Sequence, residues 1–417
     1  MVGFYEYQFK HSNRIGHMEM CSLSISYGMR DRIIVGIDVG TYQVKVVVVK
    51  RAGKNNGQAL PQIIGTGYAE SRGLRNGYII NEPDVVRSVR SAIMQAEKAA
   101  GVEIKKAYVS ISSVGLDEIF SHGEVITSRA DSEITQVDID KVMQDSEERI
   151  MEHIPNRRIL HAIPLAFTVD GERVLGRPHG LKGTKLEVDS LFVTTFEQHL
   201  SDLVNAIESI GLIVEDVMAG PLAASFVMLT KAQKRAGCVL ANIGAETVSI
   251  AVFENSIPVS LKIFPIGSND ITNDIALGLK ITLEEAEKIK RGGISSANYS
   301  KKKLDEIIAA RLTDIFELID AHLKKIKRDG LLPAGIIITG GGSGLASVQD
   351  LARVALQLPS RIATLDPGVN GKVRDASWAV AYGLCIWGAS DFEESSSIGM
   401  AKKARNSIIE WLSQFLP

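Results

Sequence analysis

The sequence has few cysteines, little net charge and no long apolar run, and each shortage excludes a class of protein. The three cysteines, Cys21, Cys238 and Cys385, are odd in number and far apart in a chain of 417 residues. They argue against a disulfide framework and predict reduced, buried thiols in a cytoplasmic protein. The net charge of −2 offers no basic surface for nucleic acid. No run of about 18 apolar residues occurs, so no segment is expected to span a membrane.

Common catalytic and metal-binding motifs are missing as well. The chain has no Gly-x-x-x-x-Gly-Lys-Ser/Thr loop, no His-Glu-x-x-His and no Cys-x-x-Cys, which excludes P-loop and structural-zinc proteins. Its eight histidines are scattered. His161 lies within an apolar segment, so we expect it to be packed or hydrogen-bonded and not a ligand.

The chain does have enough apolar residues, 45% of the total, to build large cores, and its length predicts two or more domains. Helical spacing predicts a helix that Asp84 caps and Gly101 ends. A polar helix over residues 282–291 begins with the capping box of Thr282 and Glu285, and a long helix covers residues 303–328. Spacing alone makes the polar helix a solvated surface helix.

Residues 33–49 read IIVGIDVGTYQVKVVVV, two apolar runs around a turn that contains Asp38, Gly40 and Thr41. This pattern predicts a β-hairpin. Because Gly40 lacks a Cβ atom, backbone N–H groups beside it can approach anionic oxygens, while Asp38 can bind Mg²⁺ through water. Taken alone, the segment also fits an ordinary hairpin with a turn glycine.

A second copy of this pattern occurs at residues 239–253, VLANIGAETVSIAVF. In the alignment of the two copies, Asn242 falls on Asp38, Gly244 on Gly40 and Thr247 on Gln43. The duplication predicts two related domains that face one another and hold a polyphosphate between their turns.

Residues 336–345, IIITGGGSGL, form a third element, a buried strand that turns through glycines toward a helix. Such glycines allow a flat, bulky group to lie against the backbone.

These three stretches, in this order, resemble the actin-like ATPase superfamily, whose members carry two phosphate loops and a glycine-rich adenosine loop. Within it, the chain is similar to the FtsA family of bacterial cell-division proteins from about Arg32 to the C-terminus. That closer likeness rests on LRNGYI at residues 74–79, RILHAIP at 158–164, GLKGTKLEV at 180–188 and the terminal helix. It implies an α/β fold, with duplicated actin-like (ribonuclease H-like) domains around a nucleotide cleft and an α+β insert subdomain.

The resemblance implies a set of domains along the chain. The expected divisions are a disordered or mis-annotated extension (1–30), subdomain 1A (31–81 and 170–216), the insert subdomain 1C (82–169), subdomain 2A (217–275 and 333–388), subdomain 2B (276–332), a linker (389–400) and an amphipathic membrane-targeting helix (401–417).

The resemblance also implies ATP and Mg²⁺ as cofactors. Many actin-like proteins carry Ala-Glu-x-Ile-Lys at the positions of residues 286–290, and in them the Glu and Lys reach the ribose or adenine. The resemblance therefore places Glu287 and Lys290 among the nucleotide-binding residues. Asp38 would also hold Mg²⁺ through water. The expected nucleotide-binding residues are Asp38, Gly40, Thr41, Tyr42, Gln43, Asn242, Gly244, Ala245, Glu246, Thr247, Glu287, Lys290, Gly340, Gly341, Gly342 and Ser343.

Two departures from the superfamily pattern predict weaker ATP chemistry. Gly220 precedes Pro221, where related ATPases often carry a Glu that orients the attacking water, so hydrolysis is expected to be very slow or absent, with no catalytic residue assigned. In the second phosphate loop Asn242 replaces an Asp, while Ala245 and Glu246 replace glycines. Asn242 lacks the charge that helps to hold magnesium, and Glu246 would weaken phosphate binding unless it turns away or faces the metal.

The family likeness implies an ATP-binding, polymerising adaptor that tethers the ring of the tubulin-like protein FtsZ to the cytoplasmic membrane. Subdomain 2B would bind the FtsZ C-terminal tail, the insert would contact other division proteins, and the chain would contact copies of itself in a filament. The alternative is an actin-like cytoplasmic adaptor of type IV pilus or secretion machinery. A sugar kinase or chaperone ATPase is a further class, but neither a catalytic carboxylate nor an appended peptide-binding domain is visible.

The C-terminal residues 402–416 predict attachment to the membrane surface. At 100° per residue the apolar side chains fall within an arc of about 160°, so they form one face of a helix. The segment is too short to span a bilayer. Basic residues would attract anionic headgroups while the aromatic residues enter the interface. The alternative is a terminal helix docked on the protein's own core. The expected membrane-binding residues are Ile408, Ile409, Trp411, Leu412, Phe415 and Leu416 on the apolar face, with Lys402, Lys403 and Arg405 before it.

Overall fold

The computed structural model describes residues 33–51, 61–294, 299–364 and 375–394. The expected extension at 1–30, residues 395–400 of the linker at 389–400 and the terminal helix at 401–417 lie outside these residues. The first half of the expected linker, residues 389–394, is instead helical. Within the described ranges, no helix is both long and apolar enough to cross a bilayer.

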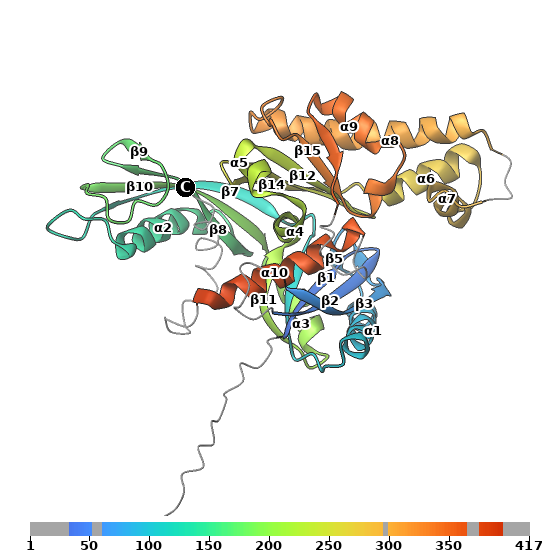
Figure 1. Cartoon of the computed structure of the whole chain (residues 1–417), viewed down its shortest axis with the longest axis horizontal. Helices are drawn as coiled ribbons and strands as arrows, with labels where there is room; N and C mark the ends of the chain where they lie inside the picture. Colours follow the sequence, from blue (N-terminus) through green and yellow to red (C-terminus); the bar gives the residue numbers. More distant parts are fainter. Residues whose placement is uncertain (1–32, 52–60, 295–298, 365–374, 395–417) are drawn as a thin grey trace, which may run out of the picture. The chain divides into compact units, whose positions relative to one another are not determined.

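The first half of the chain forms a five-stranded sheet in the order β11-β6-β1-β2-β3 (Figure 1). The predicted hairpin is its centre, since β1 and β2 pair antiparallel and place Asp38 opposite Lys45. Helices α1 and α10 cover opposite faces. A Cβ atom on Gly67 of β3 would meet Ala92 of α1, and one on Gly36 of β1 would meet Ala381 of α10. The strands are β1 (Ile33–Val39), β2 (Gln43–Lys50), β3 (Gln62–Glu70), β6 (Lys106–Ile111) and β11 (Ile213–Ala219), and the helices are α1 (Glu82–Ala100), α3 (Glu197–Glu208) and α10 (Ala379–Glu394).

The second half repeats this topology in the order β14-β13-β12-β15-β16. β12 and β13 form the second hairpin, in which Asn242 pairs with Ser249, and β15 runs parallel to β12 as β6 does to β1. The expected α/β duplication is therefore confirmed. The strands are β12 (Cys238–Ile243), β13 (Val248–Glu254), β14 (Ile257–Phe264), β15 (Ile336–Thr339) and β16 (Ser360–Ile362). Helices α4 (Gly220–Met228) and α5 (Lys231–Ala236) connect the two halves.

Helices of the second half pack through a separate apolar core. The long helix α8 is held to α6 by Arg311, which donates two hydrogen bonds to Asp274 at 2.7 and 3.1 Å. Thr282 caps α7, because its hydroxyl accepts a hydrogen bond from the N–H of Glu285, which is one of the two bonds of the expected capping box. The helices are α6 (Ser268–Leu279), α7 (Leu283–Lys290), α8 (Lys301–Lys325) and α9 (Val348–Leu356).

Between β6 and β11 the chain forms an insert, a four-stranded antiparallel sheet in the order β7-β10-β8-β9 with α2 on one face. It has its own core, which includes Val142, Leu186 and Phe192. Glu118 joins it to the second half by accepting hydrogen bonds from Ser260 and from the N–H of Leu261. The elements are β7 (Asp117–Ile126), α2 (Gln136–Met151), β8 (Arg157–Val169), β9 (Glu172–Val174) and β10 (Lys185–Phe196).

The expected insert boundaries, 82–169, need correction. α1 packs on β3 through the glycines of that strand, and β6 pairs parallel with β1, so both belong to the first sheet. β10, expected in subdomain 1A, pairs along its length with β7 and β8. The insert therefore spans residues 117–196. The cap of α1 also differs from the expectation, because Asn81 is the N-cap and accepts from the N–H of Asp84, while Gly101 ends the helix in the left-handed conformation as expected.

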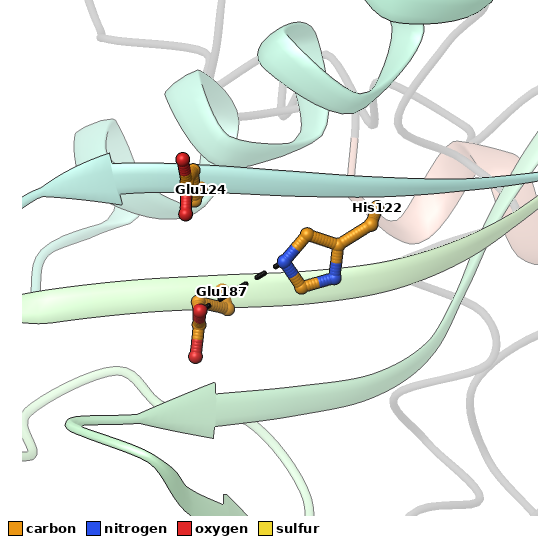
Figure 2. A group of neighbouring side chains, drawn as sticks. All are labelled: His122, Glu124 and Glu187. Atoms are coloured by element: carbon orange, nitrogen blue, oxygen red, sulfur yellow. Dashed lines mark ion pairs between the residues drawn. The ribbon is translucent and has the colours of Figure 1, made fainter.

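One face of the insert sheet carries a cluster of ionisable side chains from β7 and β10, with the His122 ring directed at Glu187 (Figure 2). Glu124 and Glu187 stand opposite one another in register, which would be unfavourable for two carboxylates alone. The ammonium group of Lys185 lies 2.8 Å from Glu124 and 2.6 Å from Glu187. Lys185 therefore already supplies the positive charge that a metal ion would bring.

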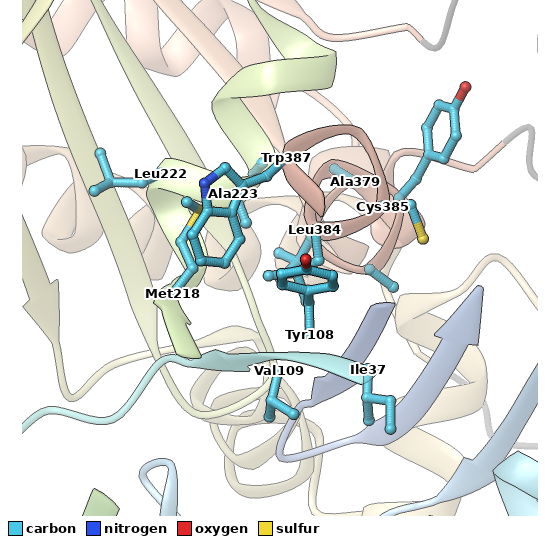
Figure 3. Close-up of a cluster of buried hydrophobic side chains, with 14 of the residues drawn as sticks. Ile37, Tyr108, Val109, Met218, Leu222, Ala223, Ala379, Leu384, Cys385 and Trp387 are labelled. Atoms are coloured by element: carbon cyan, nitrogen blue, oxygen red, sulfur yellow. The ribbon is translucent and has the colours of Figure 1, made fainter. Parts of the chain in front are cut away.

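The core of the first half packs α10 against β6 and α4 (Figure 3). Trp387 and Tyr108 meet edge to face, with ring centroids 5.2 Å apart. A Cβ atom on Gly388 would stand 2.4 Å from the Tyr108 ring, so this close approach requires glycine. The tight packing holds α10, and with it the segment before it, against the first sheet.

Candidate functional site

A cavity of about 560 Å³ lies where the two hairpin turns and the glycine-rich loop meet. Its lining includes the turn between β1 and β2 of the first sheet and the turn between β12 and β13 of the second. The loop after β15, which includes the 3₁₀ turn η1 (Gly341–Gly344), the start of α6, the end of α7 and the segment before α10 complete its lining. Three stretches separated by up to about 300 residues in sequence therefore share one cavity.

Fourteen of the sixteen residues expected to hold a nucleotide line this cavity. Ser343 instead supports the glycine loop, because its buried hydroxyl donates to the carbonyl of Gly340 at 2.7 Å. Glu246 turns away, and its carboxylate accepts a hydrogen bond from the N–H of Asn76 at 2.6 Å. The fourteen are Asp38, Gly40, Thr41, Tyr42, Gln43, Asn242, Gly244, Ala245, Thr247, Glu287, Lys290, Gly340, Gly341 and Gly342.

The first hairpin carries the strongest charges of the site. Ser110 donates to the Asp38 carboxylate at 2.8 Å, and Lys45 stands opposite Asp38 across the hairpin. Burial raises the pKa of Asp38, although Lys45 and Ser110 oppose this effect. Burial likewise lowers the pKa of Lys45, against the attraction of Asp38 and Asp375. A cation near Asp38 would relieve the cost of keeping this carboxylate charged.

Lys45 was not among the sequence-derived candidates, although it lines the cavity and donates to the carbonyl of Ser377 at 3.0 Å. The available signal was a single lysine within a strand of valines, opposite Asp38 in a hairpin register. Asp375 and Ser377, from the segment before α10, also line the cavity, and no motif marked that segment. Ser112 and Ser249 also line the cavity.

The glycines of the loop after β15 have distinct roles. Gly340 has a φ of +87°, and a Cβ atom there would stand 2.2 Å from the Asn242 side chain. A Cβ atom on Gly342 would stand 2.4 Å from Ile243, whereas one on Gly341 would meet nothing within 4 Å. The loop therefore packs tightly on the second hairpin and leaves the Gly341 backbone accessible from the cavity.

Glu287 and Lys290 of α7 lie at the cavity and pair with one another at 2.6 Å. The Lys290 ammonium group also donates to the Ser268 carbonyl and to Thr272, so its three protons are used. Burial alone would raise the pKa of Glu287, but Lys290 and Thr272 hold it below its usual range. The pair presents a fixed, charged edge to the cavity.

The position before Pro221 has no room for a side chain. A Cβ atom on Gly220 would stand 2.0 Å from the Ser112 hydroxyl oxygen. A glutamate at this position would therefore require Ser112 to move. The carboxylates that do line the cavity are Asp38, Glu287 and Asp375.

His161 is packed and hydrogen-bonded, as the sequence predicted. Its Nε2 atom accepts from the N–H of Ala219 at 3.0 Å, and burial lowers the pKa of His161 to about 3. Cys238 and Cys385 are buried free thiols, again as expected.

Taken together, the lining suits a polyphosphate with a cation and a flat group. Backbone at Gly40 and Gly244 can face anionic oxygens, Lys45 can offset their charge, and Asp38 can hold a hydrated divalent ion. Gly341 gives a flat group access to backbone, and the Glu287 carboxylate, held by Lys290, can accept hydrogen bonds from a sugar.

Comparison with known proteins agrees with this arrangement. A family model described as "Cell division protein FtsA" matches residues 239–383, and one described as "SHS2 domain inserted in FTSA" matches 118–194, inside the insert sheet. The FtsA of Bacillus subtilis is 30% identical over 375 residues, covering 85% of this chain and 83% of the relative. The FtsA of Pseudomonas aeruginosa is 28% identical over 400 residues, with coverages of 90% and 94%.

Solved structures agree on the fold. A PilM-PilN type IV pilus biogenesis complex matches with a TM-score of 0.65 at 16% identity, covering 85% of this chain and 98% of that one. An MreB 5 structure of Spiroplasma citri bound to AMPPNP matches with a TM-score of 0.51 at 12% identity, covering 88% and 98%. With the relatives and the two family models, these likenesses lead to one conclusion: the chain belongs to the FtsA family of cell division proteins and has an actin-like fold.

Proposed function

We propose that this cell-division protein binds Mg-ATP between its two halves and acts as a polymerising adaptor that tethers the FtsZ ring to the cytoplasmic membrane. The observation that carries the nucleotide part is the convergence of both hairpin turns and the glycine loop on one cavity of about 560 Å³. Membership of the FtsA family supports the adaptor part.

The chain's own residues would divide the binding of ATP among them. Gly40, Thr41 and Gly244 would face the phosphates, Asp38 would hold the hydrated Mg²⁺, and Lys45 would offset phosphate charge. Gly341 would contact the adenine, and the Glu287 carboxylate, held by Lys290, would accept hydrogen bonds from the ribose. The bound nucleotide stabilises the closed arrangement of the two halves, which is the form we expect to polymerise.

Turnover of ATP would be very slow. The position before Pro221 is Gly220, packed against Ser112, and it carries no carboxylate to orient water. We therefore assign ATP a structural role.

Three other regions would carry the contacts of the adaptor. Residues 276–332, assigned to subdomain 2B, would bind the FtsZ C-terminal tail, and the insert at 117–196 would bind other division proteins. Residues 402–416, outside the described ranges, would attach the chain to anionic lipid through their apolar face and basic cluster. The protein would then act at the cytoplasmic face of the membrane at the division site.

The pilus-adaptor alternative is less well supported. The PilM-PilN complex is similar in fold at 16% identity, whereas FtsA relatives reach 30% over most of this chain. The basic, amphipathic terminus also favours the division adaptor.

Co-sedimentation tests the adaptor directly. Purified full-length chain and a variant without the last 15 residues are each mixed with FtsZ and vesicles of phosphatidylglycerol and phosphatidylethanolamine. We expect the full chain to carry FtsZ into the vesicle pellet and the shortened chain to bind FtsZ without pelleting it. Equal pelleting by both chains, or no FtsZ with either, would exclude a membrane tether of this design.

A further inference from the structure

The turns of the two equivalent hairpins each reach across the cleft to the opposite half of the molecule. In the second hairpin, the Glu246 carboxylate accepts a hydrogen bond from the N–H of Asn76, 170 residues earlier, at 2.6 Å. In the first hairpin, the Arg291 guanidinium lies over the Tyr42 ring, 5.1 Å from its centroid. Both hairpins thus make a contact that joins the two halves.

Tyr42 and Glu246 hold the same place in the two turns. Val39 pairs with Val44 in the first hairpin as Ile243 pairs with Val248 in the second, so residue 42 aligns with residue 246. The two contacts are therefore related by the duplication, although the first is a cation–π contact and the second is a hydrogen bond to a carboxylate.

The donor of the hydrogen bond to Glu246, the Asn76 N–H, is held rigidly in the first half. Asn76 and Gly77 connect the short strands β4 (Leu74–Arg75) and β5 (Tyr78–Ile79), and both have positive φ, 50° and 81°. This is the geometry of a two-residue type I′ turn, for which Asn-Gly is the preferred pair. The Asn76 carbonyl accepts from the N–H of Val114 at 3.2 Å, which fixes the turn to the loop that follows β6.

The acceptor is held equally well in the second half. Within the turn, the N–H of Gly244 donates to the Thr247 carbonyl at 2.9 Å. The Ala245 carbonyl accepts from the N–H of Asn269 in α6 at 2.8 Å. The backbone of this turn is therefore fixed by its own half, and the Glu246 carboxylate extends from it to Asn76 in the other half.

We infer that Glu246 is a positioning residue, a clasp that holds the cleft closed by bonding the Asn76 N–H, and not a ligand of the nucleotide. A carboxylate bonded to a backbone N–H is among the stronger hydrogen bonds in proteins. The clasp also explains how a carboxylate is accommodated in a phosphate loop, since it points out of the cavity lining. Its effect on nucleotide release rests on the proposed function.

Release of nucleotide requires the cleft to open, so loss of the clasp accelerates release. In Glu246→Ala we expect the dissociation rate of a fluorescent ATP analogue to rise at least tenfold by stopped-flow displacement. Glu246→Gln retains an oxygen that accepts from Asn76 without the charge, so its rate should lie between those of wild type and Glu246→Ala. Glu284→Ala is the matched control, because Glu284 is an exposed carboxylate beside the same turn, and its rate should equal that of wild type.

Hydrogen exchange of the Asn76 amide tests the clasp without nucleotide. In the full chain we expect exchange at Asn76 to be at least tenfold faster in Glu246→Ala than in wild type or in Glu284→Ala. Unchanged exchange in Glu246→Ala would overturn the clasp. If ATP affinity falls in that variant while Asn76 remains protected, Glu246 is a direct ligand and the inference is wrong.

The two measurements separate this inference from the proposed function. A wild-type chain that fails to bind ATP would contradict the proposed function, while the exchange of Asn76 would still decide the clasp. If Glu246→Ala does not fold, Glu246→Gln decides alone. Its Asn76 amide should exchange faster than that of wild type, and equal exchange would overturn the inference.

Discussion

Asp38 and Asn242 occupy the same register position of two equivalent hairpins, but Asp38 faces Lys45 across its hairpin whereas Asn242 faces Ser249. The first hairpin therefore supplies a carboxylate and an ammonium group, and the second supplies neutral hydrogen-bonding groups. The charges of the proposed phosphate site are concentrated in one half of the molecule. This asymmetry determines how the two positions should respond to substitution.

Asn242→Asp should tighten nucleotide binding only when magnesium is present. The new carboxylate would help to hold the divalent ion, whereas without the ion it would repel Asp38 and the phosphates. Calorimetry in Mg²⁺ should show roughly tenfold tighter ATP binding, about 1.4 kcal/mol, and in EDTA binding no tighter than wild type. An equal gain in both buffers, or none in Mg²⁺, would remove Asn242 from the metal site.

Gly220→Ala should destabilise the protein, because its Cβ atom would overlap the Ser112 hydroxyl. Overpacking of this kind costs about 1–3 kcal/mol. Ser112→Ala should restore most of the loss in the double variant, since that hydroxyl is buried without a hydrogen-bond partner among the described residues. Urea denaturation of the two single variants and the double variant measures the coupling. Additive losses would mean that the two residues do not compete for space.

Stability should fall as the pH drops below about 6.5, partly through His161. Its pKa is about 3 in the folded chain, below the usual 6.5, so the unfolded state binds the proton first. The stabilising contribution is complete above pH 6.5 and is lost as the pH falls toward 3. Between pH 7 and pH 5 this loss is about 2 kcal/mol.

His161→Gln should reduce that pH dependence by a similar amount, because glutamine accepts from the Ala219 N–H without titrating. Urea denaturation at both pH values provides the comparison. The variant retains a second buried histidine, His322, whose pKa is about 4, so some pH dependence of its stability should remain. A pH dependence in His161→Gln as steep as in wild type would place the titrating groups elsewhere.

Trp411→Glu should release the chain from anionic vesicles without lowering its melting temperature. The substitution places a charge on the apolar face of the proposed membrane helix. Vesicle flotation and a thermal melt together test the prediction. A lower melting temperature with vesicle binding retained would mean that the helix belongs to the folded core, and the adaptor proposal would lose its membrane anchor.

The hairpins and the duplication could be predicted because each places two apolar runs around a short turn with glycine, and Asp38 aligns with Asn242 without gaps. The insert boundary could not. The amphipathic pattern of helix α1 would be the same whether it packed on the first sheet or on the insert. Its close approach to Gly65 and Gly67 of β3 shows that it packs on the first sheet. Long-range strand pairing, such as β10 with β7, leaves no local signal in the sequence.

The site shows the same limit. The glycines and the turn at Asp38 could be recognised from residue type alone. Asp375 lies in a segment without a motif and reaches the cavity only because α10 packs on the first sheet. The sequence also left two directions open for Glu246, toward the metal or away from it. Its partner, Asn76, is 170 residues distant and could be identified only from the folded chain.

Equilibrium titration of Mg-ATP into the wild-type chain and Asp38→Ala, by calorimetry, tests the central claim most directly. Asp38→Asn serves as the control of nearly equal shape. We expect one ATP per wild-type chain and at least tenfold weaker binding in both variants, a loss of about 1.4 kcal/mol or more. Wild-type affinity in either variant, or no binding of ATP by the wild type, would contradict a nucleotide site between the two hairpins.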